Sequence, residues 1–159
     1  MDIRVGKIEA VKRHPEADSL YVESINVGEE KPRTIVSGLV RYHTLEEMQN
    51  RLLLVICNLK PAKLRGVVSE GMVLAASRGK GTPEEMVKLV EVPSNAKVGE
   101  RVTFAGFAGA PDSVVNPKKL EKIMASFGTN AEGIPGYKGV PVMTSAGICT
   151  SAVPNGHVS

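Results

Sequence analysis

The chain has 159 residues, of which 42% are hydrophobic; this is enough to form a core and excludes an intrinsically disordered protein. The formal net charge is only +3, so overall charge alone assigns no class of binding partner. Cys57 and Cys149 are the only cysteines and each lies in an apolar stretch, which excludes a disulfide framework and favours a reducing, cytoplasmic compartment.

The first forty residues predict three strands. Residues 3–12 and 20–28 are rich in β-branched side chains, and the polar residues 13–19 between them predict a turn. We therefore expect these two segments to pair as antiparallel strands. A short β-branched segment at 34–40 predicts the third strand.

The next segments complete the pattern of a small barrel. Thr44 and Glu47 have the spacing of a capping box, which predicts a short helix over 44–50. The nearly continuous apolar run 51–59 predicts a strand buried on both faces, and 71–77 predicts another strand. Five strands with a helix between the third and the fourth are typical of an OB fold. We therefore expect an all-β chain built on a five-stranded Greek-key barrel.

The character of the sequence changes after residue 105. Residues 88–93 and 100–104 predict further strands, and the glycine- and alanine-rich segment that follows predicts a boundary. We therefore expect an OB-fold domain over 1–105 and a C-terminal extension over 106–159.

The extension contains one predicted helix. Asn116 and Pro117 predict its N-terminus, Gly128 predicts its end, and its apolar stripe consists of Leu120, Ile123, Met124 and Phe127. The strand-like pieces 140–144 and 147–153 are too small for an independent core, so we expect the extension to pack on the barrel.

The basic residues are concentrated in the middle of the chain. Between Arg51 and Lys80 there are six basic residues and one acid, Glu70. Residues 58–72 predict a loop and strand edge that holds three cations able to neutralise phosphates and two polar side chains able to donate hydrogen bonds to RNA, namely Lys60, Lys63, Arg65, Asn58 and Ser69. The alternative is that these residues are solvated charges flanking a turn.

The positions of the aromatic residues bear on the kind of nucleic acid. Proteins that hold single strands stack bases on aromatic rings, yet no Phe, Tyr or Trp lies between residues 51 and 80. Tyr21 and Tyr42 lie elsewhere and are expected to be half-buried, with their hydroxyls reaching solvent. The sequence therefore favours a protein that recognises the backbone and shape of folded RNA.

The sequence lacks the patterns of common enzyme sites. It contains no phosphate-binding GxxxxGK[ST] loop, no GxSxG elbow and no Cys or His spacing for zinc. His14, His43 and His157 are scattered; His14 could meet RNA, and the alternative is a structural or incidental role. No stretch approaches the roughly 18 apolar residues of a membrane-spanning helix. We expect no catalytic residue, no metal, no cofactor and no membrane partner.

Several longer segments together resemble one family, namely IRVGKI, HPEADSLYVE, VSGLV, LEEMQNR, CNLKPAKLRGVVSEGMVLAAS and GERVTF. They are similar to the tRNA-binding domain of the endothelial monocyte-activating polypeptide II (EMAP II) family. Such domains are appended to methionyl-, tyrosyl- and lysyl-tRNA synthetases or occur as separate synthetase cofactors. PDSVVNPKKLEKI and YKGVPVMTSAGIC resemble the additional C-terminal region of the family, although KKLEKIMASFGTNAEGIPGYK lacks the tryptophan often found there.

The resemblance implies an OB fold that holds the outer corner of tRNA with little sequence preference. The family's tRNA-contact positions match Asn58, Lys60, Lys63, Arg65, Ser69 and Met72 in this chain, with outlying phosphate contacts at Arg4, Lys7, Arg13 and Arg33. Met72 could instead belong to the barrel core.

The resemblance also implies a biological context. It suggests an accessory domain without catalytic activity of its own, appended to a eukaryotic aminoacyl-tRNA synthetase of the methionyl or lysyl type or part of a synthetase cofactor. In this family the C-terminal region covers the dimer surface, so we expect a monomer. The alternative is a secreted cytokine-like or protein-scaffold module of a multisynthetase complex, in which the segment Arg4–Ile8 meets a protein partner. A role for that segment in the first strand competes with this alternative.

Overall fold

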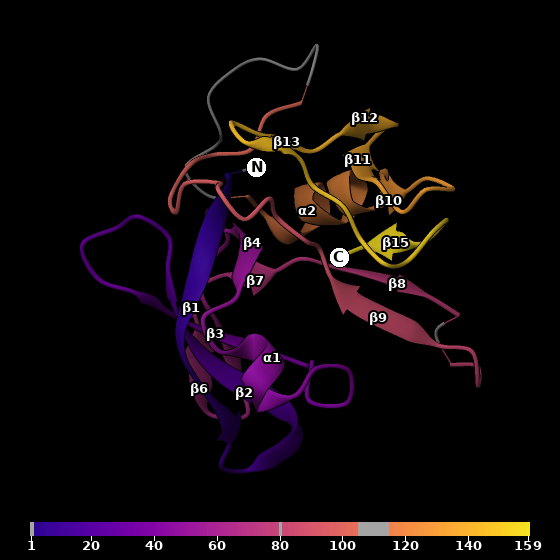
Figure 1. Ribbon diagram of the computed structural model, residues 1–159. Helices are drawn as coiled ribbons and strands as arrows, with labels where there is room; N and C mark the ends of the chain where they lie inside the picture. The colour runs from indigo at the N-terminus through magenta and orange to yellow at the C-terminus, as the bar shows by residue number, and fades with distance from the viewer. Residues whose placement is uncertain (1, 80, 105–114) are drawn as a thin grey trace.

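The barrel is built around one long strand. The computed structural model describes residues 2–79, 81–104 and 115–159 (Figure 1), and its five-stranded sheet has the order β3-β2-β1-β4-β7. The central strand β1 (Ile3–His14) pairs antiparallel with β2 (Ala17–Asn26) and with β4 (Leu52–Ile56). The edge strands are β3 (Arg33–Ser37) and β7 (Met72–Val73). The turn between β1 and β2 is shorter than predicted, because both strands extend into residues 13–19.

The two edges of this sheet meet at the segment that precedes β7. The Glu70 backbone N–H donates to the Thr34 carbonyl at 2.8 Å, and the Thr34 N–H donates to the Glu70 carboxylate at 3.0 Å. The Val36 N–H donates to the hydroxyl of Ser69 at 2.9 Å. These bonds nearly close the sheet into a barrel, which confirms the predicted OB-like fold.

Strand β4 is buried on both faces, as predicted. Its residues Leu53 to Ile56 are each at most 1% exposed. Leu53 and Val55 pack into the barrel cluster with Tyr21 and Ile25, whereas the alternating neighbours of Leu53 and Val55 contribute to a second cluster. Strand β4 therefore serves two cores, one inside the barrel and one between the barrel and the C-terminal region.

The short helix α1 (Leu45–Met48) begins where the sequence predicts. The Glu47 N–H donates to the Thr44 hydroxyl at 3.2 Å, and the Thr44 N–H donates to the Glu47 carboxylate at 3.3 Å. These two bonds form the capping box. The side chain of Met48 is fully buried in the barrel cluster.

The C-terminal region completes a second sheet, of order β12-β11-β10-β15-β8-β9. Its strands are β8 (Ala75–Arg78), β9 (Met86–Leu89), β10 (Phe127–Thr129), β11 (Pro135–Tyr137), β12 (Val140–Pro141) and β15 (His157–Val158). A separate hairpin consists of β13 (Met143–Thr144) and β14 (Gly147–Ile148). Because β15 pairs with β8, the extension is joined to the chain that leaves the barrel.

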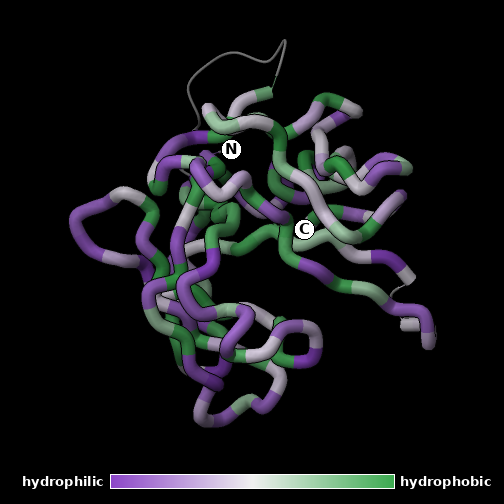
Figure 2. Tube along the Cα trace, viewed as in Figure 1, coloured by the Kyte–Doolittle hydropathy of each residue, from purple (hydrophilic) through white to green (hydrophobic). Residues whose placement is uncertain are grey.

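The two regions also share hydrophobic contacts, which confirms that the extension packs on the barrel. Val142, Cys149 and Val153 from the extension join the same buried cluster as Leu54 and Ile56. Figure 2 shows hydrophobic residues along the packed strands and hydrophilic residues in the peripheral loops. The predicted boundary between 1–105 and 106–159 falls within residues 105–114, outside the described residues, and stays a prediction.

Helix α2 (Pro117–Met124) is shorter than predicted. Asn116 caps its first turn, because its side-chain oxygen accepts a hydrogen bond from the Lys119 N–H at 2.8 Å. The predicted continuation through Phe127 to Gly128 is wrong. Phe127 lies in β10, where it pairs with Tyr137 of β11, and its ring packs edge-on against Phe104 with 5.8 Å between the ring centroids. These cross-strand and aromatic contacts replace the last helical turn. Neither described helix is long and apolar enough to cross a membrane.

The predicted strand at residues 100–104 is also wrong. Isolated bridges form there in place of a strand, among them Arg101 with Arg4 and Thr103 with Met143. Residues 100–102 bond to β1, whereas Thr103 pairs with Met143 of the C-terminal region, so the segment forms no continuous ladder with either.

A close contact between two glycines generates a stability prediction. Gly28 has φ +82°, and a Cβ added there would lie 2.6 Å from the Cα of Gly99. Gly66 has a similar φ of +87° but has no atom within 4 Å of the corresponding position. We predict that Gly28→Ala lowers the free energy of unfolding by about 3 kcal/mol and that Gly66→Ala lowers it by about 1 kcal/mol. Urea unfolding curves of both variants measure the difference, and equal losses would contradict the steric explanation.

Candidate nucleic-acid interface

The basic segment forms a hairpin that the sequence did not predict. Strands β5 (Ala62–Leu64) and β6 (Val67–Ser69) pair antiparallel, where we expected a loop and strand edge. The two residues between them, Arg65 and Gly66, have φ values of 51° and 87°. Positive φ at both turn residues matches the twist of a two-residue hairpin. The β5–β6 hairpin therefore projects as a defined element.

The three cations of this segment are available to an anionic partner. Lys60, Lys63 and Arg65 are all exposed, and none forms an ion pair with another described residue. The nearby acid Glu70 directs its carboxylate to the backbone of β3. The structure thus brings the three predicted cations together on one hairpin and its leading segment. We call them the hairpin cations.

The two polar residues predicted to contact RNA are buried at the base of the hairpin. The side-chain oxygen of Asn58 accepts a hydrogen bond from the Asp2 N–H at 2.8 Å. The Ser69 hydroxyl accepts from Val36 and donates to the Gly71 carbonyl at 3.0 Å. These bonds hold both ends of the hairpin segment against the barrel.

Arg33 also braces the hairpin base. Its guanidinium donates to both carboxylate oxygens of Glu29, at 2.7 and 2.9 Å, and to the carbonyls of Cys57 and Glu70, at 2.7 and 2.9 Å. The hydrogen bonds from Arg33 hold the pKa of Glu29 below its ordinary value. Arg33 therefore joins three segments of chain and has its charge balanced by an acid.

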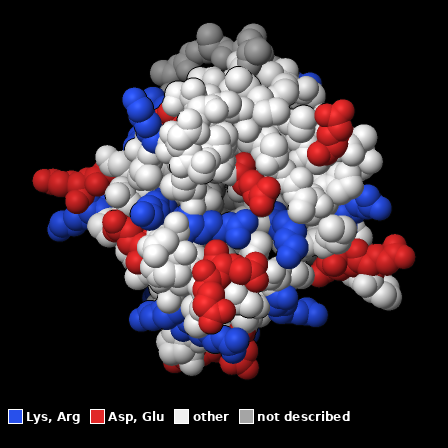
Figure 3. Space-filling model, viewed as in Figure 1, with Lys and Arg blue, Asp and Glu red and all other residues white. Residues whose placement is uncertain are grey.

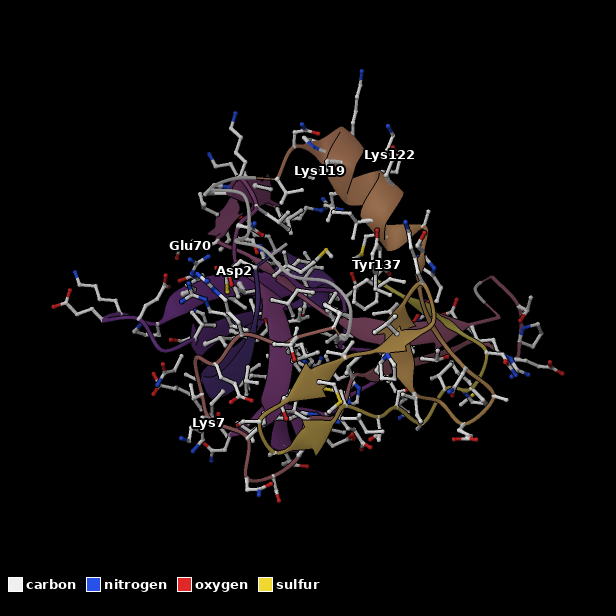
Figure 4. The ribbon with its side chains drawn as sticks, turned by 90° about the horizontal axis from the view of Figure 1, so that it is seen from above. Asp2, Lys7, Glu70, Lys119, Lys122 and Tyr137 are labelled. Carbon is white, nitrogen blue, oxygen red and sulfur yellow. The ribbon has the colours of Figure 1, made fainter. Side chains whose placement is uncertain are left out.

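The remaining predicted positions are spread over the barrel. Arg4 bonds to the Asp2 carboxylate at 3.0 Å, whereas Lys7 and Arg13 are exposed on β1. Figure 4 shows Lys7 on the opposite side of the molecule from Lys119 and Lys122. Met72 is half-buried against the shared core, the buried cluster to which both the barrel and the C-terminal extension contribute. The face shown in Figure 3 mixes basic and acidic side chains, so it offers no continuous cationic surface.

A groove of about 430 Å³ lies beside the hairpin, and sequence reasoning missed its main polar residue. Val67 from β6 lines the groove together with Lys12, Pro15 and Glu23. Glu23 is fully buried, and burial raises its pKa to about 8. One of its carboxylate oxygens accepts a hydrogen bond from Ser37, and the other has no partner among the described residues. The inward alternation of Tyr21, Glu23 and Ile25 along β2 was the available signal.

The other polar groups that could carry chemistry have structural roles. Tyr21 is only 1% exposed and donates its hydroxyl to the His43 carbonyl at 2.6 Å, so the predicted half-buried position is wrong. His43 accepts from the Leu89 N–H at 3.1 Å. Burial raises the pKa of the Cys57 thiol to about 11, so this thiol stays protonated. In the part of the chain that the structure describes, no three His, Cys, Asp or Glu residues are grouped to hold a metal.

Glu23 generates a prediction about pH. Its pKa in the folded protein is above the ordinary value of 4.5, so the folded state binds this proton more tightly. The resulting stabilisation is complete below about pH 4.5 and is lost as the pH rises through about 8. We predict that Glu23→Gln removes this dependence and raises the free energy of unfolding above about pH 9 by about 3–5 kcal/mol. Urea unfolding of the wild type, Glu23→Gln and the exposed control Glu30→Gln at several pH values tests this, and parallel curves for the first two would contradict it.

Comparison with known proteins agrees with this arrangement. Residues 3–101 match the family model described as "Putative tRNA binding domain". The chain is 54% identical over 161 residues to the cytoplasmic methionine–tRNA ligase of Arabidopsis thaliana, covering 99% of this chain and 20% of that protein. It is 49% identical over 152 residues to the mouse aminoacyl tRNA synthase complex-interacting multifunctional protein 1, covering 94% of this chain and 47% of that protein.

A solved structure extends the similarity across both regions. The C-terminal domain of Plasmodium vivax p43 superposes with a TM-score of 0.91 and 34% identity, covering 99% of this chain and 96% of that one. The superposition thus includes the extension as well as the barrel. With the family model matching more than half of the chain, this protein belongs to the tRNA-binding domain family.

Proposed function

We propose that this chain binds tRNA through its sugar-phosphate backbone, with Lys60, Lys63 and Arg65 as the main contacts and no catalytic step of its own. The observation that carries this proposal is the exposure of three cations without ion-pair partners among the described residues, on a hairpin whose base is fixed. Lysine and arginine neutralise phosphates, and a hairpin held in place loses little conformational freedom on binding.

The surroundings of the hairpin favour folded RNA over a single strand. Single-strand binders stack bases on exposed aromatic rings. Here Phe104, Phe127 and Tyr137 pack against one another, with ring centroids 5.8 to 6.2 Å apart. The hairpin itself contains no aromatic residue. Recognition therefore depends on where phosphates lie in space, which suits the outer corner of tRNA.

The predicted site residues take different roles in this proposal. Lys7 and Arg13 are exposed and contact outlying phosphates. Asn58 and Ser69 hold the hairpin base instead of meeting RNA, and Arg33 braces it. Arg4 stays with Asp2, and Met72 packs in the core.

The protein as a whole is proposed to use this domain to retain tRNA. An appended tRNA-binding domain raises the local concentration of tRNA near a catalytic body without taking part in aminoacylation. We propose a parent aminoacyl-tRNA synthetase of the methionyl type, acting in the cytoplasm, with a lysyl enzyme or a synthetase cofactor as alternatives. The similarity to the Arabidopsis enzyme supports the first choice. We further propose that the extension, paired with β8, leaves the domain monomeric.

A cytokine-like role receives less support from the fold. The segment Arg4–Ile8 lies in the central strand β1, with Val5 and Ile8 fully buried. A partner protein could reach their side chains only if the barrel opened. We therefore favour RNA over a protein partner for this segment.

The hairpin cations provide the direct test. We predict that the wild type binds total tRNA in the micromolar range, roughly 1–100 μM near physiological salt, with affinity falling steeply as salt rises. The variant K60A/K63A/R65A should bind about tenfold more weakly or worse near 0.1 M salt. The slope of the logarithm of its association constant against the logarithm of salt concentration should be shallower by about 2 to 3. Filter binding over a salt series measures both quantities.

The matched control is K31A/R41A/K97A, which removes the same number and kinds of charge from exposed positions elsewhere on the barrel. Wild-type affinity in the hairpin variant, with correct folding by circular dichroism, would refute the assignment of the site.

A further inference from the structure

Helix α2 starts beside the root of the cationic hairpin. Leu59 and Val115 form a parallel bridge, and the Val115 N–H donates to the Asn58 carbonyl at 2.7 Å. The chain that leads into the hairpin therefore runs alongside the chain that leads into α2. Lys60 and Asn116 each follow the bridge by one residue. Two segments far apart in sequence thus leave the same point of the molecule, one as a hairpin and one as a helix.

Lysines dominate the solvent side of α2. Leu120, Ile123 and Met124 pack into the shared core, so the opposite side of the helix faces solvent. Lys118 and Lys122 are exposed and lie one helical turn apart. Figure 4 shows Lys119 and Lys122 on α2 at one edge of the molecule. The single acid of the helix, Glu121, forms no ion pair with a described residue.

The charge of Lys118 is unfavourable for the helix itself, whereas Lys122 lies in the last turn, where a cation is favourable. The first turn contains Lys118 and Lys119 and no acid. Cations near a helix N-terminus oppose the macrodipole, typically by about 0.3–1 kcal/mol each, and like charges four residues apart repel. Asn116 caps the Lys119 N–H, so capping of the first turn does not need the Lys118 side chain. The unfavourable position of Lys118 in the first turn is typical of a functional surface.

We infer that Lys118 and Lys122 contact RNA phosphates and extend the hairpin site across the barrel into the C-terminal extension. The occupant is the same folded RNA that meets Lys60, so this inference rests on the proposed function. Charge complementarity and the shared root of the two elements support it. A single RNA seated here spans both regions of the chain, and the extension takes a direct part in binding.

The test compares two double variants in the full chain. K118A/K122A removes the helix charges, and K31A/K97A removes the same charge from two loops that touch through Gly28 and Gly99. In filter binding of total tRNA over a salt series, K118A/K122A should have an affinity about tenfold weaker than the wild type near 0.1 M salt. The slope of the logarithm of its association constant against the logarithm of salt concentration should be shallower by about 1.5. The control should stay within about twofold of the wild type.

Folding and rescue are checked in parallel. Alanine has a helix propensity at least equal to that of lysine, so circular dichroism should be unchanged and the midpoint of thermal unfolding should not fall. K118R/K122R keeps both charges and should restore affinity, and K118Q/K122Q replaces the alanine variant if that one misfolds.

The possible outcomes separate the two proposals. If K60A/K63A/R65A loses tRNA binding but K118A/K122A binds like the control, the proposed function stands and the inference about Lys118 and Lys122 is overturned. The same result is expected if α2 binds an acidic protein instead of RNA. Wild-type binding in the hairpin variant overturns the proposed function itself.

Discussion

The hydrogen bonds that join Ser69 and Glu70 to β3 are the constraint on which the rest of the site depends. A sheet whose edge strands stay apart leaves backbone donors and acceptors unpaired, and burying them would be costly. Here the chain between β6 and β7 supplies the missing partners to Thr34 and Val36. The same bonds fix one end of the β5–β6 hairpin. Closing the barrel and positioning the cations are therefore one structural event.

The residues at the site fall into two groups, those that fix the hairpin to the barrel and those that are exposed on it. Asn58, Ser69 and Arg33 form hydrogen bonds within the protein. The hairpin cations have no such partners among the described residues and keep their charges for solvent or a ligand. A cation that must leave an ion pair before binding phosphate would gain less from the exchange. A fixed hairpin base and cations without ion-pair partners among the described residues suit a surface that recognises the positions of phosphates.

Glu23 adds an unusual element to this frame. A carboxyl group with a pKa raised to about 8 is mostly protonated near neutral pH, so it enters the core without a full charge. Its neighbour Ser37 belongs to β3, the strand that closes the barrel. The ionisation of one buried group is thus coupled to the same strand that positions the hairpin.

Much of the fold could be predicted from local signals, and the failures have identifiable causes. The capping box at Thr44 and the apolar run of β4 are short-range patterns, and both predict the observed elements. The β5–β6 hairpin escaped because its strands are three residues long and Arg65, not a glycine or asparagine, takes the first left-handed position. Phe127 fits the helical spacing, but its cross-strand partner Tyr137 decides its conformation.

The candidate site shows the same limit. The hairpin cations all lie within residues 60–65, so their clustering was visible in the sequence. The approach of α2 to the hairpin depends on the bridge between Leu59 and Val115, which no local pattern reveals. Sequence reasoning therefore identified the charged segment but not the second element beside it.

The pairing of β15 with β8 has a consequence for biosynthesis. His157 lies opposite Ser77, so β8 leaves the ribosome long before its neighbour has been translated. Until then one edge of β8 presents unpaired backbone groups, the kind of template on which nascent chains pair wrongly. Completion of this sheet therefore waits for a strand that lies 80 residues further along the chain than the edge it covers.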